Sequence, residues 1–149
     1  MGERYQPRKL GLEETIRLLV REHAAMTEGL RRAHEAAHNG DFASAGRMLR
    51  ELDPLFRQHI VDEESQILGL LVRTVGVEGA EKEISVFRQH GPIYSLMLKV
   101  SELAAASAVE LESKESELEA LFSEHALAEE SWVFPRAASL GSGGARTRR

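Results

Sequence analysis

The 149-residue sequence predicts an all-α fold, an up-down-up-down four-helix bundle. Strand signals are sparse, because aromatic residues make up only 5% of the chain and alternating Val, Ile and Thr runs do not occur. Helix-forming Ala, Leu, Glu and Arg dominate the long stretches instead. Three short breaks divide the chain into four segments of similar length, and such short connections make neighbouring helices antiparallel.

The three breaks carry different helix-end signals. Gly40 is suited to end the first helix, and Asp41 to cap the second through its carboxylate. The Gly-containing segment 74–79 marks the second break. Residues 107–110 fit the capping box S-x-x-E, which predicts the start of the fourth helix. The predicted helices therefore span roughly residues 11–38, 41–74, 79–106 and 108–135.

Other local signals refine this division. Pro54 and Pro92 lie inside the predicted second and third helices, where each removes a backbone donor and should kink the helix. We expect residues 1–10 to form an N-terminal arm and residues 11–136 to form the bundle. The Gly- and Ser-containing segment 137–149 is predicted to be a flexible C-terminal tail.

Composition excludes several functional classes. With 19 Lys and Arg against 24 Asp and Glu, the net charge of -5 argues against a nucleic-acid partner. The chain has no Cys, so disulfide frameworks, zinc fingers and thiol nucleophiles are excluded, and a metal must bind His, carboxylate or phenolate. The longest apolar run, residues 67–72, is too short to span a membrane, and the N-terminus lacks a signal-peptide core. We expect a cytoplasmic protein without a membrane partner.

The rows of residues predicted to face the bundle core contain unusual polar members. Apolar residues at alternating spacings of three and four define these rows, which also include Glu115, Gln66 and Trp132. One histidine falls in each row, about 17 or 18 residues from the nearest predicted turn, so all four lie at nearly one level. These histidines are His23, His59, His90 and His125.

Two glutamates share the rows with the histidines. The spacing H-x-x-x-E occurs at His59 and Glu63 and again at His125 and Glu129, and a four-residue spacing places both side chains on one helix face. A buried carboxylate costs several kcal/mol unless a positive charge meets it, and the rows contain no Lys or Arg. A bound cation is therefore the expected counter-charge. The adjacent Glu64 and Glu130 point about 100° away.

A repeated tetrapeptide accompanies the histidines. The sequence Phe-Arg-Gln-His occurs at residues 56–59 and again at residues 87–90, and Phe122 likewise precedes its histidine by three residues. We expect Phe56, Phe87 and Phe122 to form an apolar pocket wall around the metal layer.

The number and type of donors indicate two metal ions. Six nitrogen and oxygen ligands exceed the needs of one tetrahedral zinc and suit two octahedral first-row ions that share carboxylates. Two iron ions are favoured, with manganese as the alternative, and a bridging oxide or hydroxide is expected to balance their charge. The predicted ligands are His23, His59, Glu63, His90, His125 and Glu129.

These motifs resemble those of the hemerythrin-like (HHE cation-binding) family of four-helix bundles, over residues 11–136. The resemblance implies a non-haem di-iron centre in which Glu63 and Glu129 bridge the irons and the histidines are terminal ligands. Oxygen carriers of that family have a second histidine one turn after the third-helix histidine, where this chain has Tyr94. This difference argues against reversible oxygen storage. Tyr94 is expected to be a phenolate ligand, a hydrogen-bond donor to an iron-bound oxygen species, or a core tyrosine whose hydroxyl finds another partner.

The predicted function is the binding or reaction of a small molecule, O2, NO or peroxide, in sensing, detoxification or iron handling. One alternative is a di-iron enzyme that disproportionates peroxide, and another is a metal-free helical interaction bundle. A third alternative is a zinc metallopeptidase, because His34, Glu35 and His38 match H-E-x-x-H. That motif lies at the end of the first helix, away from the core-facing row, which disfavours it. The sequence does not predict an oligomeric state.

Overall fold

The structure is a computed structural model that describes residues 5–147, with side chains described through residue 142. It confirms the all-α prediction, because the described residues form helices and turns without a strand. The helices form four rods. In chain order, the rods are α1 (Leu12–His38); α2 (Phe42–Asp62) continued by η1 (Glu63–Leu68) and α3 (Gly69–Gly79); α4 (Glu81–Phe87) and α5 (His90–Ala105); and α6 (Leu111–Ala128) continued by η2 (Glu129–Val133) and α7 (Phe134–Thr147).

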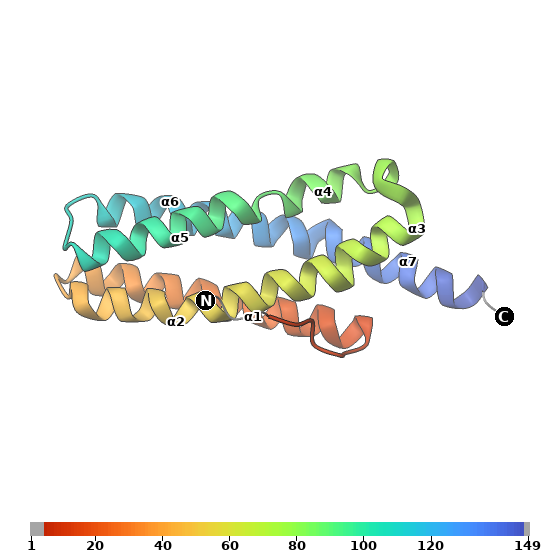
Figure 1. Cartoon of the computed structure of the whole chain (residues 1–149), viewed down its shortest axis with the longest axis horizontal. Coiled ribbons are helices and arrows are strands. Elements are labelled where there is room, and N and C mark those ends of the chain that lie inside the picture. The colour runs from red at the N-terminus through yellow and green to blue at the C-terminus, as the bar shows by residue number, and fades with distance from the viewer. Residues whose placement is uncertain (1–4, 148–149) are drawn as a thin grey trace.

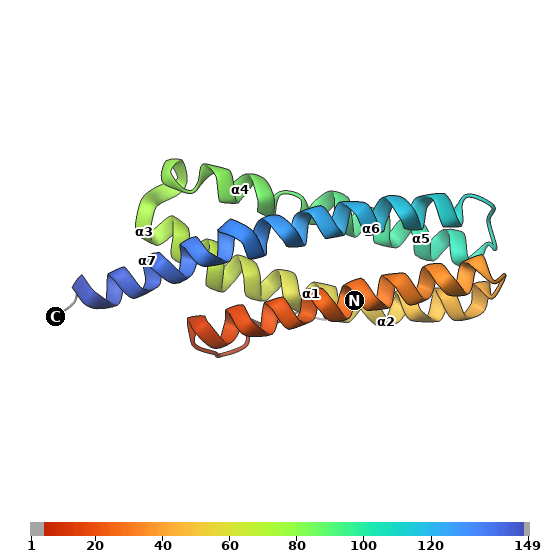
Figure 2. The same ribbon diagram turned by 180° about the vertical axis from the view of Figure 1, so that it is seen from behind.

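The rods close into a four-sided bundle (Figure 1). Helix α1 packs on α2 and α6, and α5 packs on the same two helices from the opposite corner. The turns that follow α1 and α5 lie together at one end, and the connection between α3 and α4 lies at the other (Figure 1). Figure 2 shows α6 and α7 as one continuous rod whose C-terminal end projects beyond the other helices.

The first turn uses the predicted residues. Gly40 adopts φ 80°, and its N–H donates to the carbonyl of Ala37 at 3.0 Å. The Asp41 carboxylate then accepts from the backbone N–H of Ser44 at 3.1 Å, as expected of an N-cap. Both predicted roles are confirmed.

The predicted capping box at residues 107–110 is wrong. Ser107 adopts φ 49° and donates its N–H to Ala104, while the N–H of Ala108 donates to Leu103. This is the left-handed helix ending that Gly40 makes in the first turn. Ser107 therefore ends α5, and α6 begins only at Leu111, without a side-chain cap.

The second break and the two prolines differ in their effects. Gly76 adopts φ 77° and kinks α3 within the predicted break. Helix α2 continues through Pro54. The third rod, however, is interrupted at residues 88–89, directly before the first turn of α5. Pro92 lies in that turn and has no N–H to donate to the carbonyl of Arg88, which accounts for the interruption.

The predicted flexible tail is largely helical. Helix α7 continues through Thr147, because Ala137 is fully buried and Leu140 packs partly buried against the same apolar cluster. The backbone after residue 136 is therefore regular as far as the structure describes it. Residues 1–4 of the predicted arm and residues 148–149 of the predicted tail lie outside the described residues.

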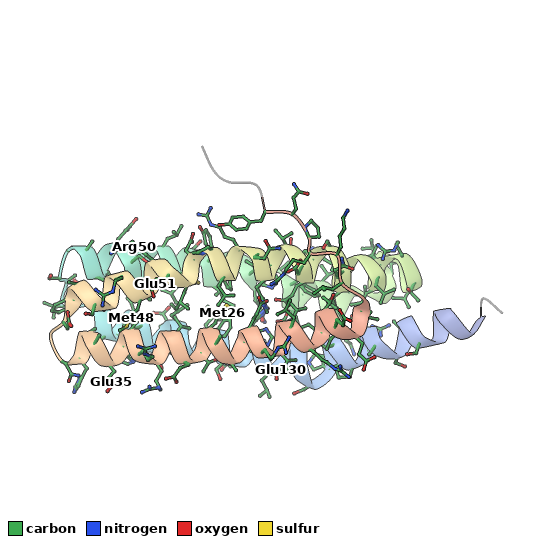
Figure 3. All side chains as sticks on the ribbon, turned by 90° about the horizontal axis from the view of Figure 1, so that it is seen from below. Met26, Glu35, Met48, Arg50, Glu51 and Glu130 are labelled. Atoms are coloured by element: carbon green, nitrogen blue, oxygen red, sulfur yellow. The ribbon has the colours of Figure 1, made fainter. Side chains whose placement is uncertain are left out.

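The apolar core has two parts, one on each side of the histidine level. One cluster includes Met26 and fills the end near the α1–α2 turn, and the other includes Leu19 and fills the end near α3 and α4. Figure 3 shows Met26 between the helices, whereas the labelled Glu35 and Arg50 lie on the outside. Within residues 5–147, no helix combines the length and apolar character that a membrane crossing requires.

Candidate metal centre

The structure brings together all six predicted metal ligands between the two apolar clusters. The two glutamates are fully buried, and the histidines are at most 5% exposed. The six side chains form two overlapping groups, and in each group one potential ligand atom per residue lies within 4.8 Å of the others. Glu63 and Glu129 belong to both groups. The first group adds His23 and His59, and the second adds His90 and His125.

The inward-facing atoms approach one another closely. The Nε2 atom of His59 lies 2.5 Å from Oε1 of Glu63, and the Nε2 atoms of His23 and His125 each lie 3.0 Å from Oε1 of Glu129. The Nε2 atom of His90 lies 3.6 Å from Glu63 and 3.8 Å from Glu129. The four imidazoles therefore surround the two carboxylates.

Most of these inner atoms lack a well-formed hydrogen bond. Both carboxylate oxygens of Glu63 and of Glu129 are without a partner, as are the Nε2 atoms of three of the histidines. Buried polar atoms are nearly always satisfied in folded proteins, so a group of orphaned lone pairs facing one another needs an explanation. Imidazole nitrogen and carboxylate oxygen are the donors that first-row metal ions bind. The residues present therefore fit a metal.

Each histidine is oriented from behind by a second side chain. Its Nδ1–H donates to an outer oxygen at 2.8 to 3.0 Å, which leaves the Nε2 lone pair facing inward. The four pairs are His23 with Glu130, His59 with Glu22, His90 with Glu64, and His125 with Gln89. Sequence reasoning gave these outer residues no role. The sequence feature that could have identified them is their position, because each outer residue directly precedes or follows a predicted ligand.

The buried carboxylates shift the pKa of two of the histidines. Burial lowers the pKa of His59, but Glu63 and Glu22 outweigh burial and raise the pKa to about 9. Burial likewise opposes charge on His90, yet Glu129 and Glu63 raise its pKa to about 11. The carboxylates thus favour protonated His59 and His90, and a bound metal would replace these protons.

A π-helical turn begins at the glutamate of each H-x-x-x-E motif, as η1 and η2. Such turns insert one extra residue, which shifts every later side chain around the helix axis. Ile67 and Val133 are consequently fully buried, whereas Gln66 is only partly buried and Trp132 is 39% exposed. The prediction that Gln66 and Trp132 face the core is wrong for this reason.

Aromatic side chains surround the histidine layer. Phe56, Phe87 and Phe122 are all buried. The Phe122 ring meets His23 edge-on at 5.8 Å, and the Phe87 ring meets His90 at 5.5 Å. Phe56 lies behind Phe122 at 6.4 Å. Another aromatic ring, which the sequence analysis missed, also contacts the layer: Phe134 stacks on His23 at 5.8 Å. The register shift in η2 brings it inward.

Tyr94 does not reach the centre. Its hydroxyl accepts a hydrogen bond from Nε of Arg57 at 2.9 Å and a second from the terminal guanidinium nitrogen. Its ring stacks on Phe56 at 6.0 Å. Burial and Asp53 raise the pKa of the phenol. Of the three expected roles, this geometry corresponds to a core tyrosine with its own hydrogen-bond partner.

The H-E-x-x-H motif lies on the bundle surface. His34 pairs with Glu119 at 2.7 Å, and His38, which is 76% exposed, pairs with Glu112 at 2.9 Å. Neither histidine joins a group of three potential metal ligands within the part of the chain that the structure describes.

Fold and site together define a four-helix bundle with a buried His/Glu cluster that could hold metal ions. Comparisons with protein-family models, with curated proteins and with solved structures found no match to this chain. The resemblance to hemerythrin-like proteins therefore rests on the motif residues.

Proposed function

We propose that this chain is a non-haem di-iron protein of the hemerythrin-like type that binds or reacts with a small molecule such as O2, NO or peroxide. In this proposal one iron is held by His23 and His59 and the other by His90 and His125. Glu63 and Glu129 would contribute ligand atoms to both positions.

The observation that carries the proposal is the sharing of the two glutamates by both histidine pairs. Two carboxylates shared between two imidazole pairs match a dinuclear site and exceed what a single tetrahedral ion requires. The orphaned inner oxygens of both glutamates support the same conclusion. With nitrogen and oxygen donors only, the site favours an ion such as iron over a thiolate-dependent centre.

The donor count leaves room for a further ligand. Each position is offered two histidine nitrogens and a share of two carboxylates, fewer than the six donors of an octahedral ion when each carboxylate gives one oxygen. When bound, iron would supply the redox chemistry. The chain itself supplies orientation through the outer hydrogen bonds and a layer of aromatic rings that excludes bulk water.

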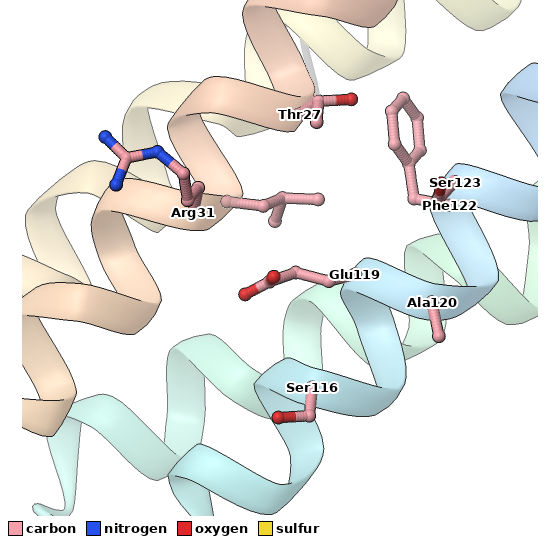
Figure 4. Close-up of a pocket in the computed structure, with 8 residues that line it drawn as sticks. Thr27, Arg31, Ser116, Glu119, Ala120, Phe122 and Ser123 are labelled. Carbon is pink, nitrogen blue, oxygen red and sulfur yellow. The ribbon is translucent and has the colours of Figure 1, made fainter.

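A groove on the bundle surface lies close to the histidine layer. A groove of about 480 Å³ lies between α1 and α6, and its lining includes Thr27, Glu119 and Phe122 (Figure 4). Leu30 and Phe122 line both this groove and a small apolar cavity inside the bundle. Because the ring of Phe122 also contacts His23, it separates the groove from the histidine layer. Sensing, detoxification and iron handling are the functions we propose for such a centre.

Ligand spectroscopy on iron-loaded protein tests the proposal. Protein loaded anaerobically with Fe(II) should change its optical spectrum when NO, O2 or peroxide is added. His59→Ala should abolish the change, whereas His38→Ala should retain it, because His38 lies on the surface away from the centre. A loaded wild-type protein whose spectrum is indifferent to all three molecules would contradict the proposal. Steady oxygen evolution from peroxide that disappears in Glu63→Ala would identify the enzyme alternative.

A further inference from the structure

The outer hydrogen bonds of the metal centre follow a two-fold pattern. The residue before His23 accepts from His59, and the residue before His90 accepts from His125. The residues that follow the two shared glutamates also accept hydrogen bonds from histidines. Glu130, which follows Glu129, accepts from His23, and Glu64, which follows Glu63, accepts from His90. The pattern is broken at one position: the residue before His23 is Glu22, and the residue before His90 is Gln89.

Glu22 belongs to a network of charged side chains. Gln89 is neutral and has no equivalent charge. The Glu22 side chain is 8% exposed, and Oε2 accepts from Arg8 at 2.9 Å while Oε1 accepts from His59. Arg8 also contacts the buried carboxylate of Asp62 through its backbone N–H and its guanidinium. Figure 3 shows the N-terminal arm that carries Arg8 crossing the outside of the bundle. One cation thus meets two carboxylates, so a net negative charge remains behind His59.

A carboxylate behind a ligand histidine strengthens the metal bond. It accepts the Nδ1 proton more strongly than a neutral amide does, so it makes the inward Nε2 a better donor. The other outer carboxylates, Glu64 and Glu130, are 48% and 38% exposed and serve one histidine of each pair. They do not distinguish the two positions. The buried Glu22 does, because its charge is poorly screened.

We propose that the two metal positions are unequal: the position of His23 and His59 binds the first divalent cation, and the position of His90 and His125 is the weaker, exchangeable one. Glu22, held by Arg8, acts as the positioning residue that sets this order. The inference rests on the proposed dinuclear centre.

Calorimetric titration of the metal-free protein with Co²⁺ tests the order. We expect two binding steps whose affinities differ by about 10- to 100-fold, the range over which outer partners affect metal affinity. Glu22→Gln should weaken the first step by a similar factor and move the second little. Gln89→Glu, the reciprocal change, should strengthen the second step. Glu124→Gln is the matched control, because Glu124 is an exposed neighbour of His125, and it should leave both steps unchanged.

The outcomes separate this inference from the metal centre itself. Weakening of only the second binding step in Glu22→Gln would overturn the proposed order. Two binding steps whose affinities are unchanged in both Glu22→Gln and Gln89→Glu would also overturn it. Failure of the wild-type protein to bind Co²⁺ would overturn the metal centre as well. Circular dichroism shows whether Glu22→Gln folds, and if it does not, Gln89→Glu decides the question, because an unmoved second step in that variant also overturns the inference.

Discussion

The bundle buries carboxylates at two levels, and these levels behave differently. At the histidine level, Glu63 and Glu129 are surrounded by four imidazoles whose Nε2 atoms face them. Glu115, on α6 and about 15 Å along the helix from His125, is also buried, at 2% exposed. Neither of its carboxylate oxygens has a hydrogen-bond partner. His34, Glu112 and Glu119 are the charged or titratable groups that act on it.

The difference shows in the protonation of the two levels. Burial raises the pKa of Glu115 to about 7, and the nearby Glu119 and Glu112 act in the same direction. Burial also favours the neutral form of Glu129, but the adjacent Glu63 and the surrounding histidines outweigh burial and hold its pKa well below the usual value. A buried carboxylate alone is therefore not a metal site. Convergence of imidazoles on it is what distinguishes the histidine level.

Removing the metal should have the largest effect. If the centre binds metal in the folded state only, a free concentration 1,000 times the Kd stabilises the protein by about 4 kcal/mol. Chelation should then lower the Tm of the loaded protein by about 8 to 16 °C, as measured by differential scanning calorimetry. The chelator should lower the Tm of Glu63→Ala much less, because this substitution removes a ligand of both positions. Identical Tm values for loaded and chelated wild-type protein would contradict the account of this level.

Arg8→Ala should have the next largest effect. It leaves the buried carboxylates of Glu22 and Asp62 without their common cation, which should lower the free energy of unfolding by about 2 kcal/mol. Urea denaturation measures this loss. Arg17→Ala is the control, because Arg17 and Glu13 form an exposed ion pair, and the loss there should stay below about 0.5 kcal/mol. Equal losses in the two variants would show that the arm does not stabilise the outer hydrogen bonds.

Glu115→Gln should stabilise the protein in a pH-dependent way. The folded-state pKa of about 7 lies above the ordinary glutamate value of 4.5, so the stability contributed by the neutral carboxyl is complete below pH 4.5 and is lost as the pH rises through 7. Glutamine cannot ionise, so the variant should gain about 1 to 2 kcal/mol over wild type at pH 8 and little at pH 4.5. Denaturation at both pH values checks this, with the exposed Glu117→Gln as control. A gain independent of pH would contradict it.

Tyr94→Phe should have the smallest effect. The hydroxyl contacts Arg57 and does not reach the histidine layer, so the optical spectrum of the iron-loaded protein should be unchanged. The free energy of unfolding should fall by less than about 1 kcal/mol, because the lost hydrogen bonds lie near the surface. A band that vanishes in this variant would instead identify Tyr94 as a phenolate ligand.

The sequence predicted the convergence of six side chains because the H-x-x-x-E spacing and the distances from the turns are regular properties of α-helices. It did not predict η1 and η2, since a constant helical period cannot register an inserted residue, and so it misplaced Gln66 and Trp132. The sequence analysis did not predict the outer hydrogen-bond partners of the histidines, for a related reason. Whether Glu22 or Gln89 reaches a histidine depends on packing between helices, which no single row of residues reveals.

Elemental analysis of protein produced with ample iron provides the decisive observation. The account predicts two iron atoms per chain in the wild-type protein and fewer in Glu63→Ala, with His38→Ala retaining both. Wild-type protein that holds no iron, and none of any other first-row metal supplied in its place, would contradict the assignment of this layer of histidines and glutamates as a dinuclear centre.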